Sequence, residues 1–217
     1  MIYHASNFSL DSLQLMTPKP MMDNYFLSNL FTHGEDILLQ TPKCTSKQGI
    51  VSSSNKKCID FVFTQSSMLS WIVSLEERVQ QLIYEKRNLW FMEDTIDMDD
   101  IQQSFVSVIK PKGEGYTVRA YLPVSEPILF NEAKLPIEES SIKETTTLVG
   151  ILHFVGIRFN QRSFQMILQV KQLMSISLPT KCLIELEEVD HFQSIVEKDE
   201  MKRMQIELEE LRQKLKK

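Results

Sequence analysis

The side chains of this sequence that could do chemistry are cations and aromatic rings. One polar stretch holds a group of lysines: Lys43, Lys47, Lys56 and Lys57. Farther along, Arg158 and Arg162 flank a polar turn that leads to Lys171. Cations neutralise phosphates and exposed rings give unstacked bases a surface to lie on, so the two together are typical of a site for single-stranded nucleic acid. The same cations are also typical of solvated loops.

Two aromatic residues are candidates for such stacking. Tyr116 and Tyr121 fall on opposite faces of one alternating segment, so one of them must point outward. Tyr121 is the stronger candidate because it shares its face with Arg119. Phe159, which we place in a turn after Arg158, is the second. Arg119, Tyr121 and Phe159 complete the predicted nucleic-acid-binding set.

Sequence signatures of catalysis do not occur. The chain has no GxxxxGKS/T, GxGxxG, HExxH or GxSxG motif. The histidines lie far apart, and His153, inside an apolar segment, is more typical of a core or edge position than of a metal ligand. Asp97, Asp99 and Asp100 suit a helix N-terminus better than a cation site, which leaves a metal-dependent nuclease as a distant alternative. We predict a protein that is not an enzyme and that has no metal and no cofactor.

The charge balance limits how nucleic acid could be bound. The formal net charge is -5, whereas domains that bind nucleic acid indiscriminately are strongly basic. Cations must therefore gather on one face if they are to form a binding surface. Three cysteines without a CxxC pair are typical of a reducing compartment. No stretch reaches the ~20 apolar residues that span a bilayer, so we expect no membrane partner.

The elements that must position these residues are mainly strands. Short apolar runs at 25–27 and 37–39 predict a hairpin, and residues 58–63 alternate as a strand. The lysine-rich stretch 43–57 is predicted to be a loop. Residues 148–173 predict a second, longer hairpin.

Two helices interrupt the strands. Spacings of four and three predict a helix from Ser66 or Ser67, one of which can cap it, to about Trp90. Its apolar stripe is Met68, Ile72, Leu75, Val79 and Leu82. Asp97 precedes a shorter helix, which we expect Pro111 to stop. Strands mixed with a few helices predict an α+β fold.

One domain and a tail are expected. Residues 1–183 form the domain, with 1–20 as an extended arm, and 184–217 form an acidic linker and a helical tail. The tail repeats apolar residues at the spacing of a coiled coil: Met201, Met204, Leu208, Leu211 and Leu215. These residues are the predicted oligomerisation site, for a homo-oligomer or for a partner protein.

A series of short segments carries a resemblance to a known family. They lie at 38–42, 58–63, 90–91, 105–110, 131–132, 135–136, 142–143, 156–159 (Gly-Ile-Arg-Phe), 163–164 and 169–172 (Gln-Val-Lys-Gln). Over residues 10 to 174, their order and spacing resemble the single-stranded-DNA-binding protein family of the nucleocytoplasmic large DNA viruses.

This resemblance implies an OB-like small β-barrel elaborated by one long and one short helix. It also implies single-stranded DNA as the ligand, no cofactor, and a role in viral DNA replication or repair in a virus factory of the host cytoplasm. Many members of that family have an aromatic residue such as Trp after the Gly-Ile pair. This chain has Arg158 there, which would replace a stacking contact by a phosphate contact.

Two functions from different classes are open. The leading one is sequence-independent binding of single-stranded DNA, with RNA as the alternative ligand. The lysines of 43–57 and the hairpin 158–171 would hold phosphates, and Tyr121 or Phe159 would stack bases. The runner-up is a virion structural or assembly protein, packaged in the virion, that uses the domain and the heptad tail as an interaction module. The acidic balance and the heptads favour the runner-up.

Overall fold

The computed structural model describes residues 1–53, 56–92, 96–123 and 129–176. Its helices are α1 (Ser66–Phe91) and α2 (Met98–Ser104), with short 3-10 turns η1 (Met22–Asn24) and η2 (Glu139–Ser141). Its strands are β1 (Ile2–His4), β2 (Leu13–Leu15), β3 (Lys19–Pro20), β4 (Phe26–Thr32), β5 (Glu35–Asp36), β6 (Leu38–Gln40), β7 (Thr45–Ser53), β8 (Lys56–Phe63), β9 (Phe105–Val106), β10 (Ile109–Lys112), β11 (Gly115–Leu122), β12 (Leu129–Phe130), β13 (Thr147–Phe159) and β14 (Phe164–Ile176). The predicted α+β class, with one long and one short helix, is confirmed.

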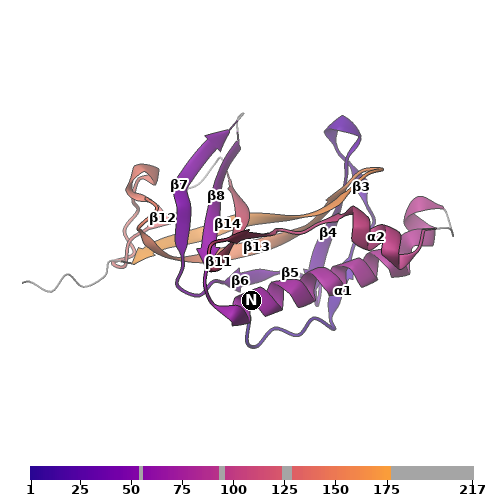
Figure 1. Cartoon of the computed structure of the whole chain (residues 1–217), viewed down its shortest axis with the longest axis horizontal. Coiled ribbons are helices and arrows are strands. Elements are labelled where there is room, and N and C mark those ends of the chain that lie inside the picture. The colour runs from indigo at the N-terminus through magenta and orange to yellow at the C-terminus, as the bar shows by residue number, and fades with distance from the viewer. Residues whose placement is uncertain (54–55, 93–95, 124–128, 177–217) are drawn as a thin grey trace, which may run out of the picture. The chain divides into compact units, whose positions relative to one another are not determined.

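The long antiparallel strands β13 and β14 form the centre of the sheet. The strand order along the main path is β1-β6-β13-β14-β11-β8-β7, and β4 pairs with residues 156–159 at the end of β13. Figure 1 shows β7, β8 and β11 rising steeply from the long strands, while α1 runs along the opposite side. One face of the sheet is therefore covered by α1 (Figure 1).

The strands form one large open sheet and not the closed barrel that the resemblance implies. In the described residues, the end strands β1 and β7 do not pair with each other. The nearest approach to closure is at Cys44, just before β7, which exchanges backbone hydrogen bonds of 2.9 and 2.8 Å with Leu148 of β13. This single bridge joins β7 to β13 without making a continuous ladder.

Helix α1 packs the predicted apolar stripe against the inner face of the sheet, and all five stripe residues are buried. Trp71 of the same helix meets Phe154 of β13 edge to face, with 5.3 Å between ring centroids. The prediction that Ser66 or Ser67 caps this helix is wrong. Gln65 occupies the cap position, and its side chain makes no hydrogen bond there. Neither described helix is long and apolar enough to cross a membrane.

Helix α2 begins as predicted and ends earlier. The Asp97 carboxylate accepts a hydrogen bond of 2.8 Å from the Asp100 backbone N–H, and the Asp97 N–H donates one of 3.1 Å to the Asp100 carboxylate. The aspartates therefore cap the helix. The helix ends at Ser104, and not near Pro111, because residues 105–106 join the sheet as β9 beside β14.

The lysine-rich stretch 43–57 is not a loop, and this prediction is wrong. Most of it forms β7, which runs antiparallel to β8 with a register shift in its middle. Gly49 permits the shift: its φ is +76°, and a Cβ there would clash with the Ile142 carbonyl. Pairing with β8 overrides the polar composition, since serine and threonine fit a strand that has one solvated face.

Candidate nucleic-acid interface

Strand β11 places Tyr121 in the middle of the outer face of the sheet. Tyr116 is only 5% exposed and belongs to the core, whereas Arg119 and Tyr121 point the other way, as the alternation predicts. Tyr121 pairs in register with Gln169 of β14 on one side and with Cys58 of β8 on the other. The half-buried ring is therefore fixed between two neighbouring strands.

A hollow of about 390 Å³ surrounds this ring, and we call it the central groove. Besides Tyr121, it is lined by Met21, Leu27, Lys56, Leu122, Pro123, Val155, Arg158, Ile167 and Gln169. Lys56 comes from β8 and Arg158 from β13, so cations from separate parts of the chain line the same groove as this ring. Most other lining side chains are apolar, which favours contact with a flat ring.

The Arg158 guanidinium is held in place without a carboxylate. One of its nitrogens, Nη2, donates a hydrogen bond of 2.8 Å to the Gln165 side chain, and its Cζ lies 4.8 Å from the centre of the Tyr25 ring. No acid of the described ranges forms an ion pair with it. The amide and the ring orient the guanidinium but leave its positive charge uncompensated. Arg158 is therefore a preformed contact for an anion.

A second hollow, the basic hollow, lies farther along the outer face of β11. Its volume is about 240 Å³, and its charged lining residues are Lys47, Asp60, Lys110, Lys112 and Arg119. Arg119 donates hydrogen bonds of 2.7 and 2.9 Å to Asp60, and this contact holds the pKa of the Asp60 carboxyl below its usual range. Arg119 and Tyr121 are two residues apart on one face, so the basic hollow lies next to the central groove.

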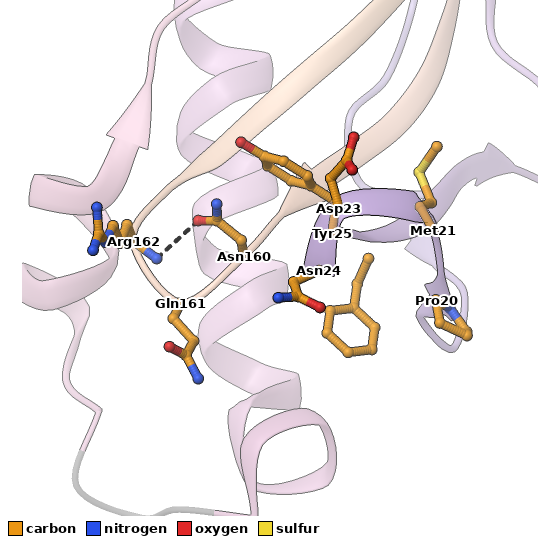
Figure 2. Close-up of a pocket in the computed structure, with 9 residues that line it drawn as sticks. Pro20, Met21, Asp23, Asn24, Tyr25, Asn160, Gln161 and Arg162 are labelled. Carbon is orange, nitrogen blue, oxygen red and sulfur yellow. Dashed lines mark hydrogen bonds between the residues drawn. The ribbon is translucent and has the colours of Figure 1, made fainter.

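A third hollow, the loop hollow, has a volume of about 650 Å³. It lies between residues 20–26 and the β13–β14 turn at 160–162, as Figure 2 shows. Met21 lines both the loop hollow and the central groove, so the two hollows adjoin at this residue. Arg162 is part of the lining on the side of the turn.

The remaining predicted cations differ in their surroundings. Lys57 bonds to Glu139 at 2.6 Å and, by strand alternation, faces away from Lys56. Lys43 is exposed ahead of β7 and lines none of the three hollows. Lys171 is exposed on β14, two residues beyond the groove residue Gln169. The predicted cations that line the hollows are Lys47, Lys56, Arg119, Arg158 and Arg162.

Phe159 is not an exposed stacking surface, and this prediction is wrong. The residue ends β13 and does not lie in a turn, and its side chain is only 5% exposed. Its ring stacks on both Phe26 and Trp90, with 5.6 Å between centroids in each pair. It is buried because β13 pairs with β4, a contact between distant segments that local sequence does not show. Phe26, 43% exposed, is the most exposed of these three rings.

Several residues that line the hollows were not predicted from the sequence. Lys110 and Lys112 lie on β10, an antiparallel neighbour of β11, in a region predicted to be the end of a helix. Pro111 lies between them, and a proline is typical of an edge strand. It was the one feature of this segment that could have indicated a strand in place of a helix end. The segment 20–26 carries no such signal, because its place beside the 160–162 turn depends on long-range packing.

The tail residues predicted to mediate oligomerisation lie outside the described residues: Met201, Met204, Leu208, Leu211 and Leu215. Oligomerisation through these residues stays a prediction. The division of the chain at residue 183 also stays a prediction.

His153 has the surroundings of a core histidine. It is buried, and its Nε2 lies 3.5 Å from an oxygen of Asp36. Burial lowers its pKa; Asp36 opposes this shift and Lys171 adds to it. Within the described ranges, no group of three or more side chains could hold a metal ion.

Comparison with known proteins gives structural likenesses alone. The chain matches no protein-family model and no curated protein. It is similar to gp2.5, a single-stranded DNA binding protein of bacteriophage T7, with a TM-score of 0.47, 14% identity, and coverage of 70% of this chain and 97% of that one. It is also similar to the single-stranded DNA-binding protein of bacteriophage Enc34, with a TM-score of 0.44, 10% identity, and coverage of 79% and 96%.

The Enc34 protein in complex with single-stranded DNA is similar as well, with a TM-score of 0.43, 9% identity, and coverage of 74% and 94%. These solved structures are single-stranded-DNA-binding proteins of bacteriophages, not of nucleocytoplasmic large DNA viruses. At such scores the likeness carries no conclusion about this chain, whose site is judged by its own residues.

Proposed function

We propose that this protein binds single-stranded DNA without sequence preference and is not an enzyme. The observation that carries the proposal is the central groove, which Lys56, Arg158 and Tyr121 line together. Stacking of a base on such a ring stabilises binding by ~1–3 kcal/mol, and the cations attract the phosphates on either side. A duplex cannot use the ring, because its bases are already stacked inside the helix.

The three hollows together form a track for the strand. The basic hollow lies beside the central groove on β11, and Met21 lines both that groove and the loop hollow. Five cations of this track form no ion pair with the described acids: Lys47, Lys56, Lys110, Arg158 and Arg162. Their gathering along these hollows would allow a chain with a net charge of -5 to attract phosphates.

Stacking and phosphate contacts are available to every base, which is why we propose binding without sequence preference. We further propose a role in viral DNA replication or repair in a virus factory of the host cytoplasm. That part rests on the resemblance of the ordered segments to the family of the nucleocytoplasmic large DNA viruses.

Fluorescence anisotropy with a labelled oligothymidylate of about 15 nucleotides tests the proposal. We expect tight binding at low salt that weakens steeply as salt is added, and much weaker binding of a duplex of equal length. Failure to bind the oligothymidylate at low salt would overturn the proposal. Equal affinity for the duplex would contradict the role of Tyr121.

A further inference from the structure

We infer that the basic hollow binds the terminal phosphate of a strand, a phosphate monoester, in preference to an internal phosphodiester. This inference rests on the proposed binding of single-stranded DNA and adds a preference for strands that carry a phosphate at one end. It starts from the cations that gather in this hollow around a single ion pair.

The ion pair between Arg119 and Asp60 lies in the middle of the basic hollow, on the two central strands of its lining. The Asp60 side chain is 11% exposed, whereas that of Arg119 is 54% exposed. Arg119 uses Nε and Nη2 for its hydrogen bonds to Asp60, and its Nη1 carries two further N–H groups. The pair therefore orients the guanidinium and leaves donors for an anion.

Lysines from the two flanking strands approach this pair. Strand β7 lies beside β8, and β10 lies beside β11. Lys47 of β7 and Lys110 of β10 therefore reach the hollow from opposite sides. Arg119 holds the pKa of the Asp60 carboxyl below its usual range, and the charges of Lys47 and Lys110 lower it further. Both ammonium groups are thus close enough to act on one carboxylate.

A β-bulge in β7 turns Lys47 toward the hollow. The residues 47–49 of β7 stand opposite the single residue Asp60 of β8. Bulges re-aim side chains in this way. The Gly49 N–H donates a hydrogen bond of 2.9 Å to the Ser46 hydroxyl, which holds the bulge in shape.

Strand β10 places Lys110 and Lys112 on the other side of the hollow. Thr117 of β11 pairs with Lys110 in register, and its hydroxyl donates a hydrogen bond of 3.3 Å to the Lys110 carbonyl. Lys112 lies 3.8 Å from Glu144, and both side chains are exposed enough that this pair is weak. No acid of the described ranges forms an ion pair with Lys47 or Lys110.

The charges of the basic hollow suit a monoester better than a diester. Its lining holds four cations and one carboxylate. A phosphate monoester carries about -1.5 to -2 charges at neutral pH and has three strong acceptor oxygens. An internal phosphodiester carries one charge and has two free oxygens. Lys47, Lys110 and Arg119 supply donors from three strands, so each oxygen of a monoester has its own partner.

The position of the basic hollow suits the end of a strand that lies in the central groove. Arg119 and Tyr121 are two residues apart on one face of β11, about 6.6–6.8 Å along the strand. A terminal nucleotide stacked on Tyr121 can therefore place its own phosphate beside Arg119. The hollow of about 240 Å³ is also the smallest of the three, which suits a single group better than a continuing strand.

The test uses three oligothymidylates of about eight nucleotides, a length within the range of single-strand sites. One carries a 5′-phosphate, one a 3′-phosphate and one no terminal phosphate, and all have the same label on an internal thymine. Anisotropy titrations should show that the wild type binds one of the two phosphorylated strands about fivefold or more tightly than the unphosphorylated one. The other phosphate should add less than about twofold, because a bound strand lies in the track in one direction.

Lys47→Ala and Lys110→Ala should each reduce this advantage to less than about twofold. Lys43→Ala is the matched control and should keep it, since Lys43 is exposed but lines none of the three hollows. The advantage is a ratio of two affinities of one protein, so a general loss of binding by a variant cancels.

Equal gains from a phosphate at either end would indicate unspecific attraction by the added charge and would overturn the inference. No gain at either end, or a gain that survives both lysine substitutions, would overturn it too, while the proposed function stands. If the wild type binds none of the three strands at low salt, the proposed function itself is overturned, and the inference with it.

Discussion

Arg119 of β11 and Asp60 of β8 face each other across neighbouring strands and are joined by two hydrogen bonds of 2.7 and 2.9 Å. The contact orients the guanidinium and neutralises its charge inside the basic hollow. The track therefore carries less positive charge than its cations alone would give. Asp60 is therefore the residue that lowers the positive charge of the track.

Asp60→Asn is expected to strengthen oligothymidylate binding at low salt by about threefold to tenfold, because Arg119 becomes free to contact a phosphate. The logarithm of affinity should also fall more steeply with the logarithm of salt, by about 0.7 for the added contact. Glu139→Gln is the matched control, since Glu139 pairs with Lys57 away from the track. Unchanged or weaker binding by Asp60→Asn would contradict the assignment of the basic hollow.

Tyr121→Ala should weaken oligothymidylate binding by about fivefold to a hundredfold, the range expected for the loss of one stacked base. Tyr121→Phe keeps the ring and should bind nearly as well as the wild type. Anisotropy titrations measure both affinities, and thermal unfolding confirms that each variant is folded. Similar affinities for the alanine variant and the wild type would show that no base stacks on Tyr121.

Phe159→Ala should lower the free energy of unfolding by about 3–5 kcal/mol, because it leaves a cavity between stacked rings. Phe26→Ala should cost less stability, since Phe26 is 43% exposed, but it should weaken binding of a strand that enters the loop hollow. Urea denaturation of both variants measures the difference. Equal destabilisation by the two substitutions would contradict the burial of Phe159 beside the more exposed Phe26.

Glu76 gives the protein a measurable pH dependence. Its buried carboxylate accepts hydrogen bonds of 2.7 Å from the Val108 N–H and 2.8 Å from the Ser107 hydroxyl. Burial raises the pKa of Glu76, and these hydrogen bonds oppose the shift without cancelling it. The folded state therefore takes up a proton at a higher pH than the unfolded state does.

Relative to Glu76→Gln, which does not titrate, the wild type should gain stability as pH falls from the raised pKa toward the ordinary value of 4.5. Below that value the difference between the two proteins should stay constant. Urea denaturation of both proteins from neutral to acid pH measures it. A difference that does not vary with pH, or that favours the variant as pH falls, would contradict the burial of this carboxylate.

Local periodicity was enough to predict the parts of the fold whose contacts are near in sequence. The stripe of α1, the Asp97 cap and the opposite faces of Tyr116 and Tyr121 follow from spacing alone. Strand β7 could not be predicted in this way, because its polar residues become a strand through pairing with β8.

The candidate site could be predicted only in part, for the same reason. Cations and a tyrosine were recognisable by type, but the pairing of β13 with β4 buries Phe159 and brings the segment 20–26 to the site. Lys56 and Lys57 are neighbours in sequence, yet only Lys56 lines the central groove. Once residues 56–63 are taken as a strand, alternation separates the two lysines.

The salt dependence of binding by matched lysine variants tests the central claim most directly. Lys56→Ala and Arg158→Ala should each reduce the slope of log affinity against log salt by about 0.7, because each removes one phosphate contact. Lys57→Ala should leave the slope unchanged, since Lys57 is paired with Glu139 at 2.6 Å and faces away from the groove. A loss of slope with Lys57→Ala as large as that with Lys56→Ala would contradict the account.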